Sequence, residues 1–204
     1  VKEVGLRTRQ GLGIPANAYV IGHMARITPW KGQESLLNVF TEYAELNQNS
    51  YLLLVGSPLF DNDKYFKYLI QLIDDYGLGK RVIMPGYRSD LKEIFSAMDI
   101  FIYPSLEKDT SPLALLSAIS AGLPAIVSNI KCLEEVVELC SAVDVFDLRN
   151  RDELLSLIVK YEDGDIRIKN GKKNWEAGKR NFAISFHARN MLKCLNTVLS
   201  CHEG

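Results

Sequence analysis

The amino-acid sequence predicts an α/β fold: a Rossmann-like doubly wound parallel sheet of about six strands with a helical C-terminal tail. Short apolar runs alternate with longer segments in which apolar residues recur every three or four positions, as when strands alternate with helices. The short runs are apolar at consecutive positions, which is typical of parallel strands that helices cover on both faces. We therefore expect right-handed crossovers between successive strands.

Six apolar runs are the expected strands, and segments of helical periodicity connect them. The strands are predicted at residues 19–25, 51–55, 81–84, 100–103, 125–127 and 142–146. The connecting helices are predicted at residues 33–46, 64–76, 91–97, 112–121 and 133–139. From about residue 151 the pattern is wholly helical, with helices at 151–161, 166–179 and 185–200. No repeat or low-complexity linker divides residues 1–204, so we expect one domain.

The composition excludes several classes of protein. The 24 basic and 25 acidic side chains leave a net charge of −1, which argues against a nucleic-acid binder with a broad cationic field. No apolar run approaches the ~20 residues that span a bilayer. Four cysteines without paired close spacing favour reduced thiols in a cytosolic protein over a disulfide framework or a metal site. The start at Val1 indicates a piece of a longer protein.

Two cations follow the first predicted strand. Arg26 and Lys31 lie five residues apart on one loop, with Pro29 between them and Gly32 directly after. In doubly wound sheets ligands bind beyond the carboxyl ends of the strands. An arginine and a lysine can together neutralise a diphosphate without a divalent metal. The alternative is a solvated loop with two incidental charges, and the position at a strand end favours binding.

A predicted helix start follows the fourth strand. Ser111 is the expected N-cap and Pro112 the expected first helical residue. The backbone N–H groups of Leu113 and Ala114 would then face an anion or a sugar hydroxyl at the helix N-terminus. Asp109 could accept hydrogen bonds from hydroxyls or be an ordinary surface acid, and the residues by themselves leave both interpretations open.

The third predicted strand ends in a turn that contains Gly86, Tyr87 and Arg88. Such a turn allows a planar base to approach the backbone and to stack on the ring or the guanidinium, although Tyr87 could equally be a packing residue. Elsewhere the sequence has no Walker A, GxGxxG, HExxH or GxSxG motif. The common P-loop, dinucleotide, zincin and hydrolase classes are therefore excluded.

Five ordered segments resemble the C-terminal half of the group 1 retaining glycosyltransferases of the GT-B fold. The segments are residues 22–32, 53–56, 82–87, 98–105 and 115–124. That family transfers a sugar from a nucleotide-diphosphate donor with retention of configuration and without a metal. Its cleft lies between an N-terminal acceptor domain and a C-terminal donor domain. The resemblance implies that residues 1–204 are the donor domain, that the acceptor domain is absent, and that no cofactor is needed.

The resemblance also implies roles for individual residues. Arg26 and Lys31 match the basic pair that holds the donor diphosphate and stabilises the leaving group. Asp109 matches a carboxylate that binds the donor sugar, and these three residues form the expected catalytic set. Tyr87 and Arg88 belong to the turn that receives the base.

The sequence departs from the family pattern near the predicted helix start. The family's paired glutamates, seven residues apart, fall on Asp109 and Ser117. A hydroxyl at 117 makes a hydrogen bond of roughly 0.5–1.5 kcal/mol to the ribose, against ~1.5–3 kcal/mol for a carboxylate. The usual Gly-Phe-Gly is also replaced. The remaining expected donor-binding residues are Thr110, Ser111, Pro112 and Leu113.

The resulting hypothesis is the donor nucleotide-sugar-binding half of a retaining, metal-independent glycosyltransferase in glycan or polysaccharide biosynthesis. The expected partners are a nucleotide-sugar and a saccharide or lipid-linked acceptor, the latter bound mainly by the absent N-terminal domain. We expect a cytoplasmic location with peripheral membrane association of the full-length protein, no nucleic-acid partner, and no transfer by the isolated chain. The alternative is a catalytically silent glycosyltransferase-like binding or interaction module.

Overall fold

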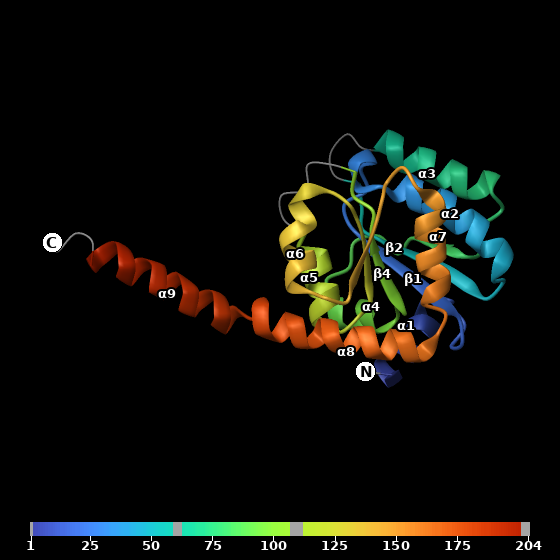
Figure 1. The fold of residues 1–204 in the computed structure, drawn as a ribbon. Helices are drawn as coiled ribbons and strands as arrows, with labels where there is room; N and C mark the ends of the chain where they lie inside the picture. Colours follow the sequence, from blue (N-terminus) through green and yellow to red (C-terminus); the bar gives the residue numbers. More distant parts are fainter. Residues whose placement is uncertain (1, 59–62, 107–111, 201–204) are drawn as a thin grey trace.

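The computed structural model describes residues 2–58, 63–106 and 112–200. Its centre is one parallel sheet with helices on both faces (Figure 1). The strands are β1 (Tyr19–Met24), β2 (Ser50–Val55), β3 (Val82–Ile83), β4 (Ile100–Tyr103), β5 (Ala125–Ser128) and β6 (Val143–Phe146). All five strand pairs are parallel, in the order β3-β2-β1-β4-β5-β6. The predicted fold class is confirmed.

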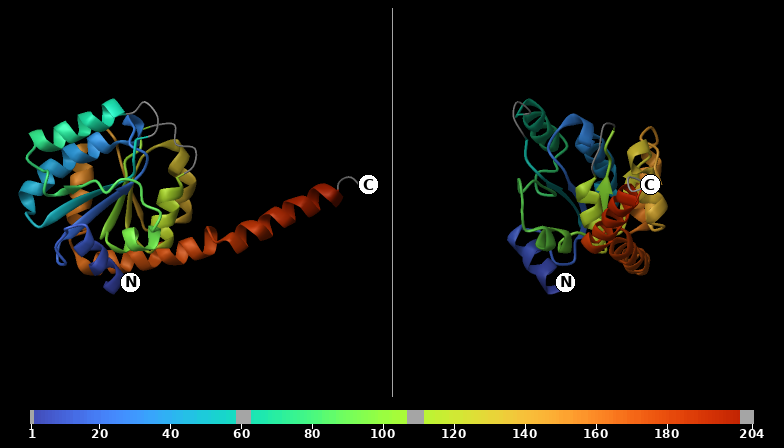
Figure 2. Two further views of the ribbon diagram at one scale, coloured as in Figure 1. Left: turned by 180° about the vertical axis from the view of Figure 1, so that it is seen from behind. Right: turned by 90° about the vertical axis from the view of Figure 1, so that its left-hand side faces the viewer.

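Helices pack against both faces of the sheet. One face carries α2 (Gln33–Leu46), α3 (Asp63–Asp75) and α7 (Arg151–Lys160), and the other carries α4 (Leu91–Ser96), α5 (Leu113–Ser120) and α6 (Glu134–Leu139). The remaining helices are α1 (Lys2–Gly11), α8 (Gly164–Asn181), α9 (Ile184–Ser200) and two 3₁₀ turns, η1 (Pro29–Lys31) and η2 (Lys131–Leu133). Figure 2 shows α8 along the body and α9 projecting away from it. Within the described ranges, no helix has the length and apolar character to cross a membrane.

β4 is apolar and buried at every position because helices cover both faces of the sheet there. In β4, Ile100 and Ile102 belong to the core beneath α2 and α7. Phe101 and Tyr103 belong to the core beneath α4, α5 and α6. All four side chains are at most 2% exposed. This two-sided burial explains why consecutive apolar residues predicted a parallel sheet.

The start of α5 differs from the prediction. The helix begins at Leu113, and Pro112 is its N-cap with φ −81° and ψ 50°. This ψ lies outside the helical region, so Pro112 is not the first helical residue. Ser111, the predicted cap, lies outside the described residues. β3 is also shorter than predicted, because Pro85 lacks the N–H that would continue its pairing with β2.

The sequence did not predict the helix α1 (Lys2–Gly11). One of its buried positions is Arg9, which does not count as apolar in a search for hydrophobic periodicity. Arg9 is 8% exposed and donates to the backbone oxygens of Ala97 and Ala18, at 2.9 Å each. It also pairs with Asp99 at 2.9 Å, whose carboxylate accepts from the backbone N–H of Val20 at 2.7 Å. These bonds fasten α1 to the amino ends of β1 and β4.

The strand order determines where a ligand can bind. From β1 the chain builds outward through β2 to β3, and it then returns to place β4 on the other side of β1. The connections after β1 and β4 therefore run to opposite sides and leave a crevice between them. This crevice at the carboxyl ends is the usual ligand position in open α/β sheets.

Gly32 provides the first test of this arrangement. It has φ +74°, and a Cβ there would lie 2.0 Å from the backbone oxygen of Pro104. Gly13 has φ +72° but nothing within 4 Å of its Cβ position. We expect Gly13→Ala to lower the free energy of unfolding by about 1 kcal/mol, and Gly32→Ala by about 3 kcal/mol because a backbone clash is added. Urea unfolding measures both, and equal losses would contradict the close packing at Gly32.

Candidate functional site

The two cations after β1 occupy different environments. The Arg26 side chain is exposed beyond the end of the strand. Lys31 is only 9% exposed, and its Nζ lies 3.4 Å from the Tyr103 hydroxyl and 5.5 Å from the centre of that ring. Tyr103 is the last residue of β4. Lys31 therefore links the loop after β1 to the end of β4, on the crevice between the two strands.

Backbone contacts join the loop after β1 to the chain after β4. The oxygen of Pro104 lies against Gly32, where only a residue without Cβ fits. The N–H of Leu106 donates to the oxygen of Trp30 at 2.9 Å. On the other side, the Ser128 hydroxyl at the end of β5 donates to the oxygen of Ser105 at 2.6 Å. The carboxyl ends of β1, β4 and β5 are thus connected.

A buried glutamine, not recognised in the sequence, supports Arg26. Gln33 is the first residue of α2 and is completely buried. Its Nε2 donates to the backbone oxygen of Arg26 at 2.7 Å. Its Oε1 and the Thr28 hydroxyl are buried and have no hydrogen-bond partner among the described residues. In the sequence, Gln33 is recognisable only as a polar residue directly after Gly32. A polar residue is also common at the start of a helix, so it does not by itself indicate this role.

The turn after β3 lies beside the same edge of the sheet. The oxygen of Gly86 accepts from the N–H of Gly56 at 2.9 Å, and a Cβ on Gly56 would meet the oxygen of Ala25 at 1.8 Å. The Tyr87 ring is 75% exposed, so it is not a packing residue within the described part of the chain. Arg88 is half-buried, and both ends of its guanidinium bond to the carboxylate of Asp90.

The predicted residues on α5 face a groove toward α4. The first intrahelical bond runs from the N–H of Leu116 to the oxygen of Pro112 at 3.0 Å, so the N–H groups of the first turn point out of the helix. Leu113 is 67% exposed, and Ser117 is half-buried. Both line a groove of about 660 Å³, together with residues that include Leu91 and Phe95 of α4 and Phe182.

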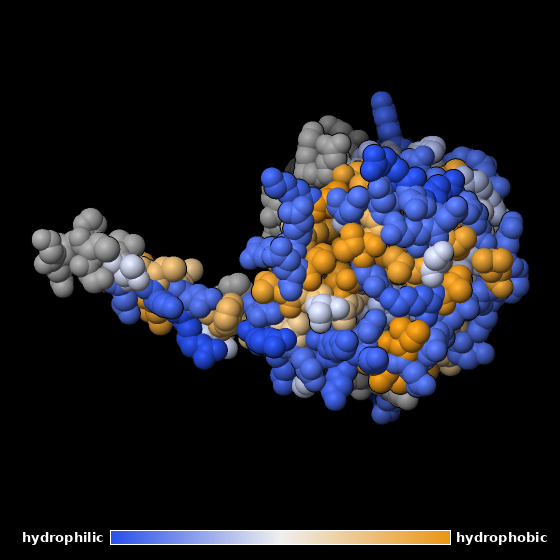
Figure 3. Space-filling view, viewed as in Figure 1, coloured by the Kyte–Doolittle hydropathy of each residue, from blue (hydrophilic) through white to orange (hydrophobic). Residues whose placement is uncertain are grey.

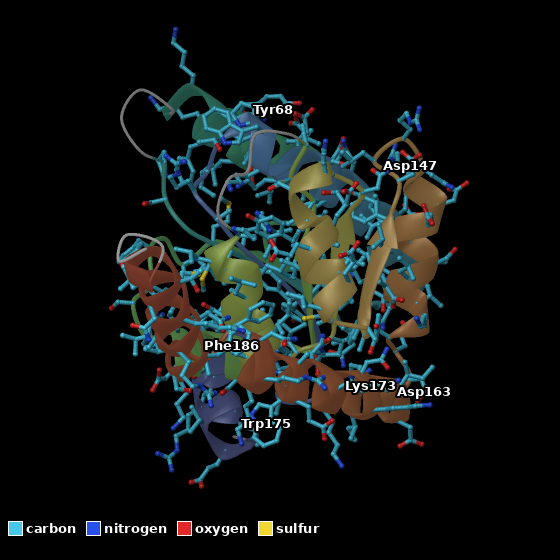
Figure 4. All side chains as sticks on the ribbon, turned by 60° about the vertical axis from the view of Figure 1, so that its left-hand side comes forward. Tyr68, Asp147, Asp163, Lys173, Trp175 and Phe186 are labelled. Carbon is cyan, nitrogen blue, oxygen red and sulfur yellow. The ribbon has the colours of Figure 1, made fainter. Side chains whose placement is uncertain are left out.

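The structure thus places the predicted residues after the carboxyl ends of three strands of one sheet. Arg26 and Lys31 follow β1, Tyr87 and Arg88 follow β3, and the residues at 112, 113 and 117 follow β4. Asp109, Thr110 and Ser111 lie outside the described residues. Figure 4 shows all described side chains on the ribbon, with Tyr68 at the site end and Trp175 at the opposite end.

The described side chains show no metal-binding cluster. In residues 2–58, 63–106 and 112–200, no three His, Cys, Asp or Glu side chains are arranged to hold a metal ion. Cys132, Cys140 and Cys194 are free thiols. His23 is 1% exposed inside β1, and its Nδ1 lies 3.0 Å from the oxygen of Ile102. This histidine is therefore a core residue of the sheet.

Sequence comparison identifies the family. The family described as "Glycosyl transferases group 1" matches residues 6–174, and the chain belongs to this family. The chain is 31% identical over 157 residues to a UDP-Gal:alpha-D-GlcNAc-diphosphoundecaprenol alpha-1,3-galactosyltransferase of Escherichia coli, covering 76% of this chain and 39% of that protein. It is 27% identical to a D-inositol 3-phosphate glycosyltransferase of Corynebacterium efficiens, covering 97% of this chain and 48% of that protein.

Solved structures share the fold. Anabaena Alr3699/HepE in complex with UDP and glucose is 25% identical, with a TM-score of 0.86 over 95% of this chain and 52% of that one. The C-terminal domain of a glycosyl transferase group 1 family protein, LpcC of Francisella tularensis, is 18% identical, with a TM-score of 0.76 over 88% of this chain and 93% of that domain. The chain spans about half the length or less of the first relatives it matches.

The ion pair beside Tyr87 gives a prediction about pH. The hydrogen bond from Arg88 holds the pKa of Asp90 below its usual range. Because the pKa is lower in the folded state, the pair stabilises the fold above the usual carboxyl pKa, and this contribution is lost as the pH falls through the folded-state value. We expect Arg88→Ala to return the Asp90 pKa upward in an NMR titration. Asp147, held by Arg149 at a pKa of about 2, is the internal control and should not change.

Proposed function

We propose that the chain is the donor nucleotide-sugar-binding half of a retaining, metal-independent glycosyltransferase of glycan biosynthesis. The observation that carries this proposal is the loop with Arg26 and Lys31 at the crevice between β1 and β4. The 25% identical structure with UDP and glucose supports a nucleotide-sugar ligand. The match to a separate C-terminal domain, over 93% of its length, supports assignment to one half of a two-domain enzyme.

The two cations suit the chemistry of a leaving diphosphate. Arg26, exposed at the crevice, can bind two phosphate oxygens with its planar guanidinium. The Lys31 ammonium, which lies beside the Tyr103 hydroxyl, supplies a compact positive charge to the same diphosphate. As the bond between the anomeric carbon and the diphosphate oxygen breaks, both cations stabilise the negative charge that develops. The acceptor hydroxyl attacks the same face of the sugar, and its proton goes to a phosphate oxygen of the leaving group.

The neighbouring residues suit the nucleoside and the sugar. The exposed Tyr87 ring offers a stacking surface for the base, with Arg88 beside it. The first-turn N–H groups of α5 can donate to phosphate or sugar oxygens. Ser117 presents a hydroxyl where the family has a glutamate, and we assign it to the ribose. Asp109 remains the proposed carboxylate for the donor sugar.

The acceptor is proposed to be a saccharide or a lipid-linked saccharide bound mainly by an N-terminal domain outside this chain. The Escherichia coli relative acts on a diphosphoundecaprenol-linked sugar, which supports an acceptor of this kind. We propose a cytoplasmic protein that associates peripherally with the membrane. The isolated chain should bind nucleotide and transfer nothing, because the acceptor side of the cleft is missing.

A second candidate is a silent binding or interaction module. Ser117 favours it, because a neutral hydroxyl replaces the carboxylate expected at the ribose. The two candidates differ in one measurement on a full-length protein that contains this chain. Transfer that is lost in Arg26→Ala and Lys31→Ala excludes the silent module, and absence of transfer with intact nucleotide binding supports it.

Nucleotide binding by this chain is the first test of the proposal. We expect one of UDP, GDP, ADP and dTDP to raise the melting temperature, since a ligand at 100 times its Kd stabilises a protein by about 2.7 kcal/mol. Arg26→Ala should abolish most of that shift, and Arg7→Ala, an exposed arginine on α1, should leave it unchanged. The site assignment is wrong if no nucleotide shifts the melt or if Arg26→Ala has no effect.

Position 117 provides the second test. Ser117→Glu restores a charged acceptor for the ribose hydroxyls, so we expect about tenfold tighter nucleotide binding by calorimetry. Ser120→Glu is the matched control, because Ser120 lines the same groove one helical turn further on. Equal effects of the two substitutions would show that charge in the groove, rather than a contact at 117, is responsible.

A further inference from the structure

Basic residues are concentrated on α8, although the whole chain is nearly neutral. The helix carries two acidic residues, Asp165 and Glu176, in a chain of net charge −1. Its basic residues are Arg167, Lys169, Lys172, Lys173, Lys179 and Arg180. A local excess of this kind creates a positive potential over one part of a neutral protein.

Within α8, four residues form one exposed stripe that borders the side packed on the body. Ile168, Lys172, Trp175 and Lys179 follow one another at spacings of four, three and four, which places them on one side of a helix. Ile168 is 71% exposed and Trp175 is 44% exposed, and both lysines are exposed. We call these four residues the α8 stripe. It combines two large apolar side chains with two cations, and the two acids of the helix, Asp165 and Glu176, lie next to it.

The side of α8 next to the stripe is fixed to the body. A Cβ on Gly171 would lie 2.3 Å from the oxygen of Gly122, and one on Gly178 would lie 3.1 Å from Ser120. The buried Asn174 donates to the oxygen of Leu123 at 2.8 Å. The stripe is therefore presented by a rigid helix, and its exposure does not come from a loosely packed segment.

The geometry of Trp175 suits an interface between water and lipid. Figure 4 shows Trp175 at the outer edge of α8, with Lys173 further along the same helix. The Lys179 ammonium lies 3.9 Å from the centre of the indole ring. Tryptophan is enriched at the headgroup level of bilayers, and a lysine can bury its carbon chain while its ammonium stays at the phosphates.

We propose that the α8 stripe is a docking surface for an anionic lipid bilayer, an inference that rests on the peripheral membrane association proposed above. Charge complementarity selects the lipid, because clustered lysines bind acidic headgroups, and Ile168 and Trp175 supply the apolar part that a bilayer accepts. A nucleic acid would use the cations but not an exposed isoleucine. In Figure 3 apolar and hydrophilic residues also lie side by side on the body's surface, so a mixed surface alone does not select a bilayer. The selective feature is the excess of six basic over two acidic residues on the helix that exposes Ile168 and Trp175.

Docking through this stripe leaves the candidate site open. α8 binds residues 122 and 123, which precede β5, so it lies at the amino ends of the strands. Arg26 and Lys31 lie at the carboxyl ends. In Figure 1, α8 is at the bottom of the body and α3 at the top. The inference is therefore independent of nucleotide binding.

Vesicle binding tests the proposal with the 204-residue chain. We expect sedimentation with vesicles of phosphatidylglycerol and phosphatidylcholine at low salt, weaker binding at high salt, and little binding to phosphatidylcholine alone. The double variant Lys172→Glu and Lys179→Glu should bind about 30-fold more weakly. The matched control is Lys64→Glu with Lys67→Glu, an equal charge change on α3. The proposal is overturned if wild type shows no preference for anionic vesicles, or if both double variants lose binding equally.

The fluorescence of Trp175 provides a second test, because its emission reports burial of the ring in lipid and not charge attraction alone. The chain has two tryptophans, so Trp30→Phe leaves Trp175 as the only one. On anionic vesicles its emission should shift to the blue, and brominated lipids should quench it. Unchanged emission in a bound protein overturns the proposal, as does tighter binding to single-stranded RNA than to vesicles at equal phosphate. The charge variants on α8 and α3 should retain the wild-type melting temperature and nucleotide response, which separates this test from that of the donor site.

Discussion

The close approach of Gly32 to the Pro104 carbonyl is the constraint on which the candidate site depends. At this point the connections after β1 and β4 touch backbone to backbone, and the contact leaves no room for a methyl group. Gly32 also ends η1 and begins α2 in a left-handed conformation. Its position places Lys31 against Tyr103 on one side and Gln33 beneath the Arg26 carbonyl on the other. One glycine therefore sets the positions of both cations.

Different interactions hold the segments together at the amino ends and at the carboxyl ends of the strands. At the amino ends of the strands, Arg9 of α1 and Asp99 form a half-buried ion pair that also binds backbone groups at the start of β1 and in the turn before β4. At the carboxyl ends, the loops are joined mainly by backbone and hydroxyl hydrogen bonds. At the amino ends, the charges of Arg9 and Asp99 bind each other and backbone groups of the protein. The arrangement at the carboxyl ends leaves the Arg26 guanidinium exposed at the crevice, where a ligand can reach it.

A net charge near zero is compatible with two local concentrations of positive charge. Arg26 and Lys31 lie at the carboxyl ends of the strands, and the α8 stripe lies at the amino ends. Because the length of the strands separates them, different partners can be bound at the two places at the same time. The net charge of the whole chain therefore excludes a broad cationic field, but it does not exclude small cationic sites.

Local patterns were enough to predict the strands, most helices and the family resemblance, because buried parallel strands leave runs of apolar residues that do not depend on distant contacts. The helix α1 was not predicted, because the burial of Arg9 depends partly on Ala97 and Asp99, about 90 residues away in the sequence. The roles of Gln33 and Tyr103 could be recognised only in the tertiary structure. Gln33 binds the backbone oxygen of Arg26, and Tyr103 accepts a hydrogen bond from Lys31. The sequence by itself determined which residues carry charge at the strand ends. Only the fold decided that Lys31 is buried against β4 while Arg26 remains exposed, because that depends on how two loops pack across the sheet.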